Sequence, residues 1–94
     1  MPHYLVEYRE LGNAEARARL RDDHIGYRRS LGMAMTGPLL DDDDKPVGSV
    51  VIIEADGQQQ AEDMAGADPY VGAGVLECVS VRKYRIASMR PPQG

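Results

Sequence analysis

The segment from Ala67 to Val71 constrains the fold most strongly, because it fixes a point at which a helix must end. Asp68 precedes a proline, and the clash with the proline ring pushes its backbone out of the helical region. Pro69 has a fixed φ and no backbone N–H to donate. Gly72 and Gly74 follow and allow a tight turn into an apolar run. The sequence therefore predicts a corner between a helix and a strand, with the carboxylate of Asp68 held at that corner.

Length and charge limit the classes of protein to which the chain can belong. Its 94 residues are enough for one domain, and its formal net charge is −4 with both signs interspersed. No basic block is present, which argues against nucleic-acid binding. Cys78 is a single cysteine, so we expect no disulfide framework and a reducing compartment. We expect a cytoplasmic protein, because no apolar run could span a bilayer and the first residues lack the pattern of a signal peptide.

Hydrophobic periodicity predicts six elements in the order strand, helix, strand, strand, helix, strand. Strands are expected at residues 3–8, 33–40, 49–55 and 75–86, and helices at 14–31 and 58–67. The run Val50 to Ile53 is apolar without alternation, which indicates a strand buried on both faces. Asp22 and Asp23 indicate a kink and a second helical segment inside the first helix.

This order predicts an α+β, ferredoxin-like βαββαβ fold, with a four-stranded antiparallel sheet and two helices on one face. The domain should span residues 1–86, and residues 87–94 should form a flexible tail. The other face of the sheet keeps apolar side chains that the two helices cannot cover. We therefore expect a homodimer in which two such faces pack together.

His24 and Asp68 are the candidate catalytic pair. His24 shares a helical stripe with Leu20, Tyr27 and Leu31, so it should face the sheet. A carboxylate bonded to one ring nitrogen fixes the tautomer of an imidazole and leaves the other nitrogen free for proton transfer. We therefore expect Asp68 to lie within hydrogen-bond reach of His24. The simpler alternatives stay open: a histidine at the boundary of the core, and an aspartate that only ends a helix.

Other polar residues have weaker signals. Arg21 and Tyr70 flank the pair in sequence and could bind an anionic or phenolic substrate, and Ser49 opens a buried strand and could donate into the same pocket. Each also has an ordinary packing or surface role. The acidic run at residues 41–44 is best interpreted as a surface loop, because adjacent carboxylates converge on a metal ion only in a defined turn. No zinc spacing, phosphate loop or dinucleotide fingerprint is present, so we expect no cofactor.

Several short motifs, taken in order, resemble the YCII (YciI-like) family. They are Arg21-x-x-His24, Gly37-Pro38, Gly48-Ser49-Val50-Val51-Ile52, and Ala67-Asp68-Pro69-Tyr70-Val71-x-Ala73-Gly74-Val75-x-Glu77-x-Val79-x-Val81. The resemblance runs from the first strand to about Tyr84, and the Asp-Pro-Tyr segment is its most specific part. The stretch from His24 to Gly37 looks about one helical turn shorter than the family pattern, which could reshape the pocket.

The resemblance implies a ferredoxin-like domain that dimerises sheet to sheet into an α+β barrel. It also implies that His24 and Asp68 match the histidine and aspartate on which an enzymatic function has been suggested for the family. One relative is similar to a dehydrochlorinase acting on a chlorinated hydroxyquinol, and muconolactone isomerases share the dimeric barrel. Two hypotheses follow. The first is a cofactor-independent enzyme that carries out an elimination or isomerisation on a small aromatic or lactone-like molecule. The second is a non-catalytic dimeric domain that binds a ligand or a protein partner.

Overall fold

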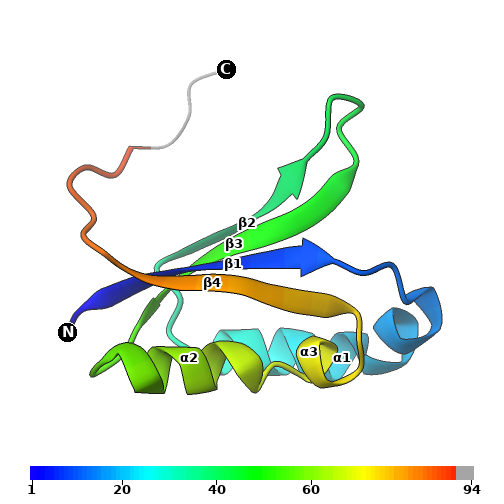
Figure 1. Cartoon of the computed structure of the whole chain (residues 1–94), viewed down its shortest axis with the longest axis horizontal. Coiled ribbons are helices and arrows are strands. Elements are labelled where there is room, and N and C mark those ends of the chain that lie inside the picture. Colours follow the sequence, from blue (N-terminus) through cyan, green and yellow to red (C-terminus); the bar gives the residue numbers. More distant parts are fainter. Residues whose placement is uncertain (91–94) are drawn as a thin grey trace.

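The computed structural model describes residues 1–90 and has an α+β fold built on one sheet. The elements are β1 (His3–Glu10), α1 (Ala14–Ser30), β2 (Met35–Leu40), β3 (Pro46–Glu54), α2 (Gln58–Gly66), α3 (Pro69–Gly72) and β4 (Leu76–Tyr84). The four strands are antiparallel in the order β2-β3-β1-β4, and all three helices lie on one face of the sheet (Figure 1). The predicted ferredoxin-like fold is confirmed. In the described part of the chain, no helix has the length and apolar character needed to cross a membrane.

Three local predictions differ from the structure. The short helix α3 lies between α2 and β4, where a tight turn was expected. Helix α1 is continuous, and Asp22 and Asp23 are exposed on it, so they neither cap a second helix nor introduce a kink. Strand β3 begins at Pro46, and the acidic run forms the hairpin turn before it, where Asp41 Oδ1 accepts from the backbone N–H of Lys45 at 3.0 Å. Residues 87–90 are exposed and irregular, and residues 91–94 of the expected tail lie outside the described residues.

The core lies between the sheet and the helices. Tyr4, Val6 and Tyr8 alternate along β1, and each is at most 3% exposed. Their cross-strand partners on β3 include Val51 and Ile53, which are both 1% exposed. Side chains of successive residues in a strand point to opposite faces of a sheet, so this alternation defines the face that the helices cover.

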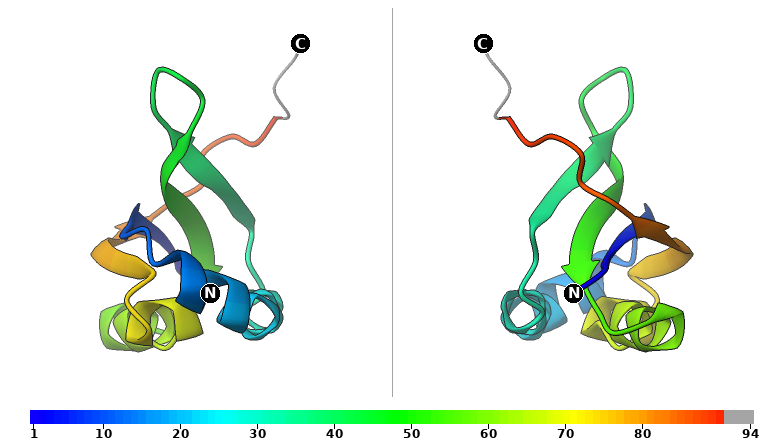
Figure 2. Two further views of the ribbon diagram at one scale, coloured as in Figure 1. Left: turned by 90° about the vertical axis from the view of Figure 1, so that its right-hand side faces the viewer. Right: turned by 90° about the vertical axis from the view of Figure 1, so that its left-hand side faces the viewer.

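The two long helices approach this face differently. Helix α2 presents Ala61 and Ala65, which are 0% and 1% exposed, and the hydroxyl of Tyr8 donates to the carbonyl oxygen of Ala65 at 2.7 Å. Such small side chains let a helix lie close to a sheet. Figure 2 shows the β2–β3 hairpin curving away from the helices. The space beneath the hairpin, on the α1 side, holds the candidate site.

The opposite face of the sheet carries apolar side chains. Leu5 pairs across the strands with Ile52, which pairs in turn with Met35. Met35 is 49% exposed and Leu39, further along β2, is 37% exposed. Within residues 1–90, no helix lies over this face (Figure 1).

Candidate functional site

Asp68 is held in place by the start of α3. It is the N-cap residue of this helix, with φ −59° and ψ 128°, and Pro69 occupies the first helical position. Its Oδ1 accepts from the backbone N–H of Tyr70 at 2.9 Å, as expected of an aspartate N-cap. The side chain is completely buried. The proline that ends α2 therefore also fixes the carboxylate, which faces α1.

Two side chains of α1 donate to this carboxylate. The ring Nδ1 of His24 lies 2.8 Å from Asp68 Oδ1, and the Nε–H of Arg28 donates to Asp68 Oδ2 at 2.7 Å. The two donors are four residues apart, so they lie on the same face of the helix. The predicted contact between His24 and Asp68 is thus present. Arg28 was not predicted, and it is the cation that balances the buried carboxylate.

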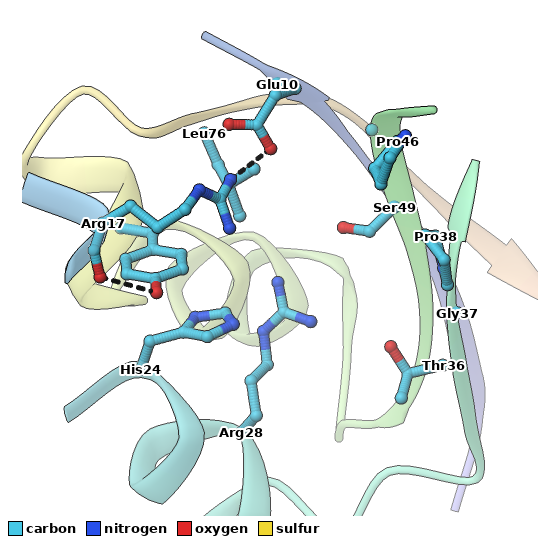
Figure 3. A pocket seen from close by; sticks show the side chains of 12 residues that line it. Glu10, Arg17, His24, Arg28, Thr36, Gly37, Pro38, Pro46, Ser49 and Leu76 are labelled. Carbon is cyan, nitrogen blue, oxygen red and sulfur yellow. Dashed lines mark hydrogen bonds and ion pairs between the residues drawn. The ribbon is translucent and has the colours of Figure 1, made fainter. Parts of the chain in front are cut away.

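The imidazole of His24 is fixed on a second side by Tyr70. The two rings are stacked, with centroids 3.9 Å apart and planes 6° from parallel. The hydroxyl of Tyr70 donates to the carbonyl oxygen of Arg17 at 3.0 Å, which holds the stack against α1. Because an ionised carboxylate can only accept, Nδ1 of His24 carries the hydrogen toward Asp68. In a neutral imidazole Nε2 then has the free lone pair, and this edge of the ring faces Arg28 and the cavity (Figure 3).

A cavity of about 470 Å³ adjoins His24 and separates α1 from the β2–β3 hairpin. Its polar lining residues are Glu10, Arg17, His24, Arg28, Thr36 and Ser49 (Figure 3). The side chain of His24 is 18% exposed and lines this cavity. Glu10 and Arg17 form an ion pair at its rim.

Two of these groups are buried without a hydrogen-bond partner among the described residues. They are Nη2 of Arg28 and Oγ of Ser49. The guanidinium of Arg28 also packs over the ring of Tyr8, with its central carbon 4.7 Å from the ring centroid. Arg28 is therefore oriented from two sides, while one of its terminal nitrogens lacks an acceptor within residues 1–90.

Nearby titratable groups are poor candidates for bases or nucleophiles. Burial is the main cause that raises the pKa of Tyr8 and of Tyr27 above 10.0, so both phenols stay protonated at neutral pH. The hydroxyl of Tyr27 donates to the carbonyl oxygen of Met64 at 2.6 Å. Burial likewise raises the pKa of the Cys78 thiol, and only the thiolate is strongly nucleophilic. Among the described lining residues, His24 carries an imidazole, the side-chain type that most often transfers protons near neutral pH.

The structure brings together four of the five residues singled out from the sequence. His24, Asp68 and Tyr70 form one contact network, and Ser49 faces them across the cavity. Arg21 is different, because it is exposed and is not among the described residues that line the cavity. The role of Arg21 in substrate binding stays a prediction.

Helix geometry explains this difference. Arg21 lies about 60° around the helix from His24, whereas Arg17 and Arg28 lie within about 40°. Spacings of seven and four residues from His24 place both arginines near its face of the helix. Their selection needed the direction of the cavity, which the sequence does not contain.

Comparisons with known proteins support the fold. The sequence model of the family described as YCII-related domain matches residues 1–85. An uncharacterized protein of Haemophilus influenzae is 30% identical, with 88% of this chain and 96% of that protein covered. A solved structure of 5-chloro-2-hydroxyhydroquinone dehydrochlorinase from Burkholderia phenoliruptrix, in complex with 2,5-dihydroxybenzoquinone, has a TM-score of 0.63 at 23% identity and covers 90% of this chain and 92% of that one. At 23% identity, the likeness to the dehydrochlorinase structure shows a shared fold.

Proposed function

The chain belongs to the family of YCII-related domains, and we propose that it is a cofactor-independent enzyme in which His24 transfers a proton to and from a small molecule. One observation carries the proposal. A buried carboxylate occupies Nδ1 of His24 at 2.8 Å, while the opposite edge of the ring faces a cavity of about 470 Å³. This volume lies in the range of small-molecule sites, and a neutral imidazole oriented in this way is an efficient base near neutral pH.

The proposed reaction is an elimination or an isomerisation. In an elimination, Nε2 of His24 takes a proton from the substrate, the electron pair of the broken bond forms a new π bond, and the leaving group departs with its own electron pair. In an isomerisation, the same proton returns to a different atom. Asp68 and Arg28 stay in place, and the carboxylate stabilises the imidazolium formed in between.

The proposed substrate is a small aromatic or lactone-like molecule. The cavity suits one ring, and the neighbour of the same fold is a dehydrochlorinase with a quinone bound. Tyr70 acts on the orientation of the base. Its stacking fixes the plane of His24, so the basic nitrogen is presented to the substrate in one direction.

A second candidate function is a non-catalytic, dimeric, ligand-binding domain or protein-interaction domain. The observation that favours it is the structural role of Asp68, which caps α3 and neutralises the buried Arg28. On this alternative His24 contributes to stability alone.

The experiment that separates the two candidates combines activity with folding. Phenols, quinols and lactones are screened against the purified protein, and any turnover is compared between the native chain and the His24→Asn variant. We expect the variant to keep its melting temperature within a few degrees and to lose turnover by at least about a hundredfold. His3→Asn is the matched control, because His3 lies on β1 and is not among the residues that line this cavity. A variant that mainly loses melting temperature would favour the structural alternative.

We also propose a homodimer formed through the face of the sheet that carries Leu5, Val50 and Ile52. Half-exposed apolar side chains at its margin, such as Met35 and Val79, support this arrangement. Two sheets that pack face to face would remove these side chains from water.

A further inference from the structure

Two hydrogen-bonding groups on the cavity wall are left incomplete by the fold. Arg28 is 7% exposed and its Nε–H is used by Asp68, yet its Nη2 has no acceptor among residues 1–90. Oγ of Ser49 is also buried and has no partner in the same part of the chain. Buried donors that lack an acceptor are costly. A ligand that accepts hydrogen bonds would complete both groups.

The two groups come from opposite walls and face the same space. Arg28 projects from α1 and Ser49 from β3, and Figure 3 shows the guanidinium and the hydroxyl both directed into the cavity between them. His24 lies beside Arg28 on the same helix. A ligand that meets both groups would thus lie in the same cavity as the edge of the imidazole.

The charges around this space favour an anion. The charged residues in the described lining are two arginines, Arg17 and Arg28, and one carboxylate, while Asp68, the partner of Arg28, is outside that lining. Glu10 is the one carboxylate in the described lining, and it is paired with Arg17. An arginine can only donate, and its bonds to an anionic oxygen are stronger than those to a neutral acceptor.

Thr36 shows that an unpartnered hydroxyl is not general in this cavity. Its Oγ1 donates to the carbonyl oxygen of Val50 at 3.1 Å, so this hydroxyl is already used by the fold. Ser49 lies on the other strand of the same hairpin. It differs from Thr36 because its buried hydroxyl makes no such bond within the described residues.

We propose that Arg28 and Ser49 form a binding subsite for an anionic oxygen of the substrate, which restricts the substrate class to small organic acids. The oxygen belongs to a carboxylate or to an ionised phenol. The inference rests on the proposed function in one respect, because that function makes the bound molecule a substrate. Binding at the subsite is itself measured without turnover. Arg28 thereby has two roles: it orients Asp68 with one nitrogen and holds the substrate with another.

The test is a calorimetric titration at about pH 8, where an ordinary imidazole is neutral. The probes are benzoate against benzamide, and 4-nitrophenol, which is ionised at this pH, against 4-nitroanisole, which cannot ionise. We expect at least one of the two anions to bind about tenfold or more tightly than its neutral match. The anion that does so identifies the source of the oxygen. If neither anion is preferred, the proposal is wrong.

Substitutions show which residues cause the preference for the anion. Arg28→Gln should remove it, and Ser49→Ala should weaken anion binding about threefold to tenfold without lowering the melting temperature, because the hydroxyl makes no bond within the described fold. The matched controls are Arg21→Gln, which removes an exposed charge from the same helix, and Thr36→Val, which removes a hydroxyl already bonded to the backbone. Both should bind the anion as the native chain does.

The results of this binding test can be distinguished from the results of the turnover test of the proposed function. Unchanged anion binding in Ser49→Ala would overturn the subsite even if Arg28→Gln failed to fold. Selective anion binding that depends on Ser49 supports the subsite, whether or not any compound in the screen shows turnover that depends on His24. Retention of anion binding in His24→Asn would further show that the subsite acts independently of the proposed base.

Discussion

The two long helices lie on the same face of one sheet but meet it in different ways. Helix α2 meets it through the small, fully buried side chains of Ala61 and Ala65. Helix α1 packs Ala16 into the core near its first turn, and further along it places His24 and Arg28, whose long polar side chains line a cavity. The length of the inward-facing side chains therefore divides the interior. One half is a close-packed core, and the other is a polar site with space for a molecule.

The polar half also depends on one buried carboxylate. Three donors from two parts of the chain meet at Asp68, and its side chain is completely buried. A buried charge is tolerated when its partners are complete and becomes costly when one is removed. The α2 half should therefore be sensitive to volume, and the α1 half should be sensitive to charge.

Removal of the carboxylate should give the largest effect. Asp68→Asn keeps the shape of the side chain but leaves Arg28 as an uncompensated buried charge, and we expect the free energy of unfolding to fall by about 3–5 kcal/mol. Chemical denaturation measures this. The control Asp23→Asn, at an exposed position of α1, should change stability by less than about 0.5 kcal/mol. A loss below about 1 kcal/mol in Asp68→Asn would contradict a charge-dependent site.

Larger side chains should give the second-largest effect, and they should lower the stability more in the α2 half than in the α1 half. Ala65→Leu inserts a large side chain where α2 is packed against the sheet, so we expect a loss of about 1–3 kcal/mol. Thr36→Leu adds volume at the wall of the cavity and should cost less than about 1 kcal/mol, mostly from the lost bond to Val50. Equal losses in the two variants, measured by the same denaturation, would show that the halves are packed alike.

The proposed dimer can be tested at the face of the sheet that no helix within residues 1–90 covers. Met35→Lys places a charge on a side chain that is 49% exposed in the single chain, so the fold should survive while sheet-to-sheet association weakens about tenfold or more, or about 1.4 kcal/mol. Light scattering at micromolar concentration should report a shift from dimer to monomer. Leu11→Lys is the control, since Leu11 is 47% exposed but lies outside the strands. A native chain that is already monomeric would rule out the dimer.

Alkaline pH should weaken the close-packed half gradually. Burial raises the pKa of Tyr8 in the folded chain above 10.0, so the unfolded chain loses this proton first and stability falls as pH rises above about 10. Tyr27 and Cys78 act in the same direction. Tyr8→Phe should cost about 1 kcal/mol at neutral pH through the lost bond to Ala65 but make the alkaline decline shallower. The midpoint of denaturation at several alkaline pH values measures this, with the exposed Tyr84→Phe as control. An unchanged slope in Tyr8→Phe would assign the decline to other groups.

Much of the fold could be predicted, because its signals are local. Tyr4, Val6 and Tyr8 alternate along β1 as the sequence indicates, and Pro69 ends α2 for a steric reason that needs no tertiary information. Helix α3 was missed because four residues are too few to show a period. The helix α1 also continues through Asp22 and Asp23, since both side chains point to solvent and do not compete for the backbone.

The site could be predicted only in part. His24 and Asp68 were identifiable because each has an unusual local setting, a histidine on an apolar stripe and an aspartate before a proline. Arg28 lies 40 residues from its acceptor, and in the sequence it resembles any surface arginine of a helix. Oγ of Ser49 has no partner within residues 1–90, and this depends on the tertiary arrangement around the cavity, which no spacing in the sequence reports.

The tautomer of His24 is the most direct test of the proposal that its Nε2 acts as a base. Nitrogen-15 NMR at about pH 8, where an ordinary imidazole is neutral, distinguishes a protonated Nδ1 from a protonated Nε2. The account predicts that His24 carries its hydrogen on Nδ1, toward Asp68, and that Asp68→Asn reduces this preference. His3 is an internal reference, because its Nε2 faces Glu54 at 3.5 Å and should carry the hydrogen instead. A hydrogen on Nε2 of His24 would leave no free base at the cavity and would contradict the account.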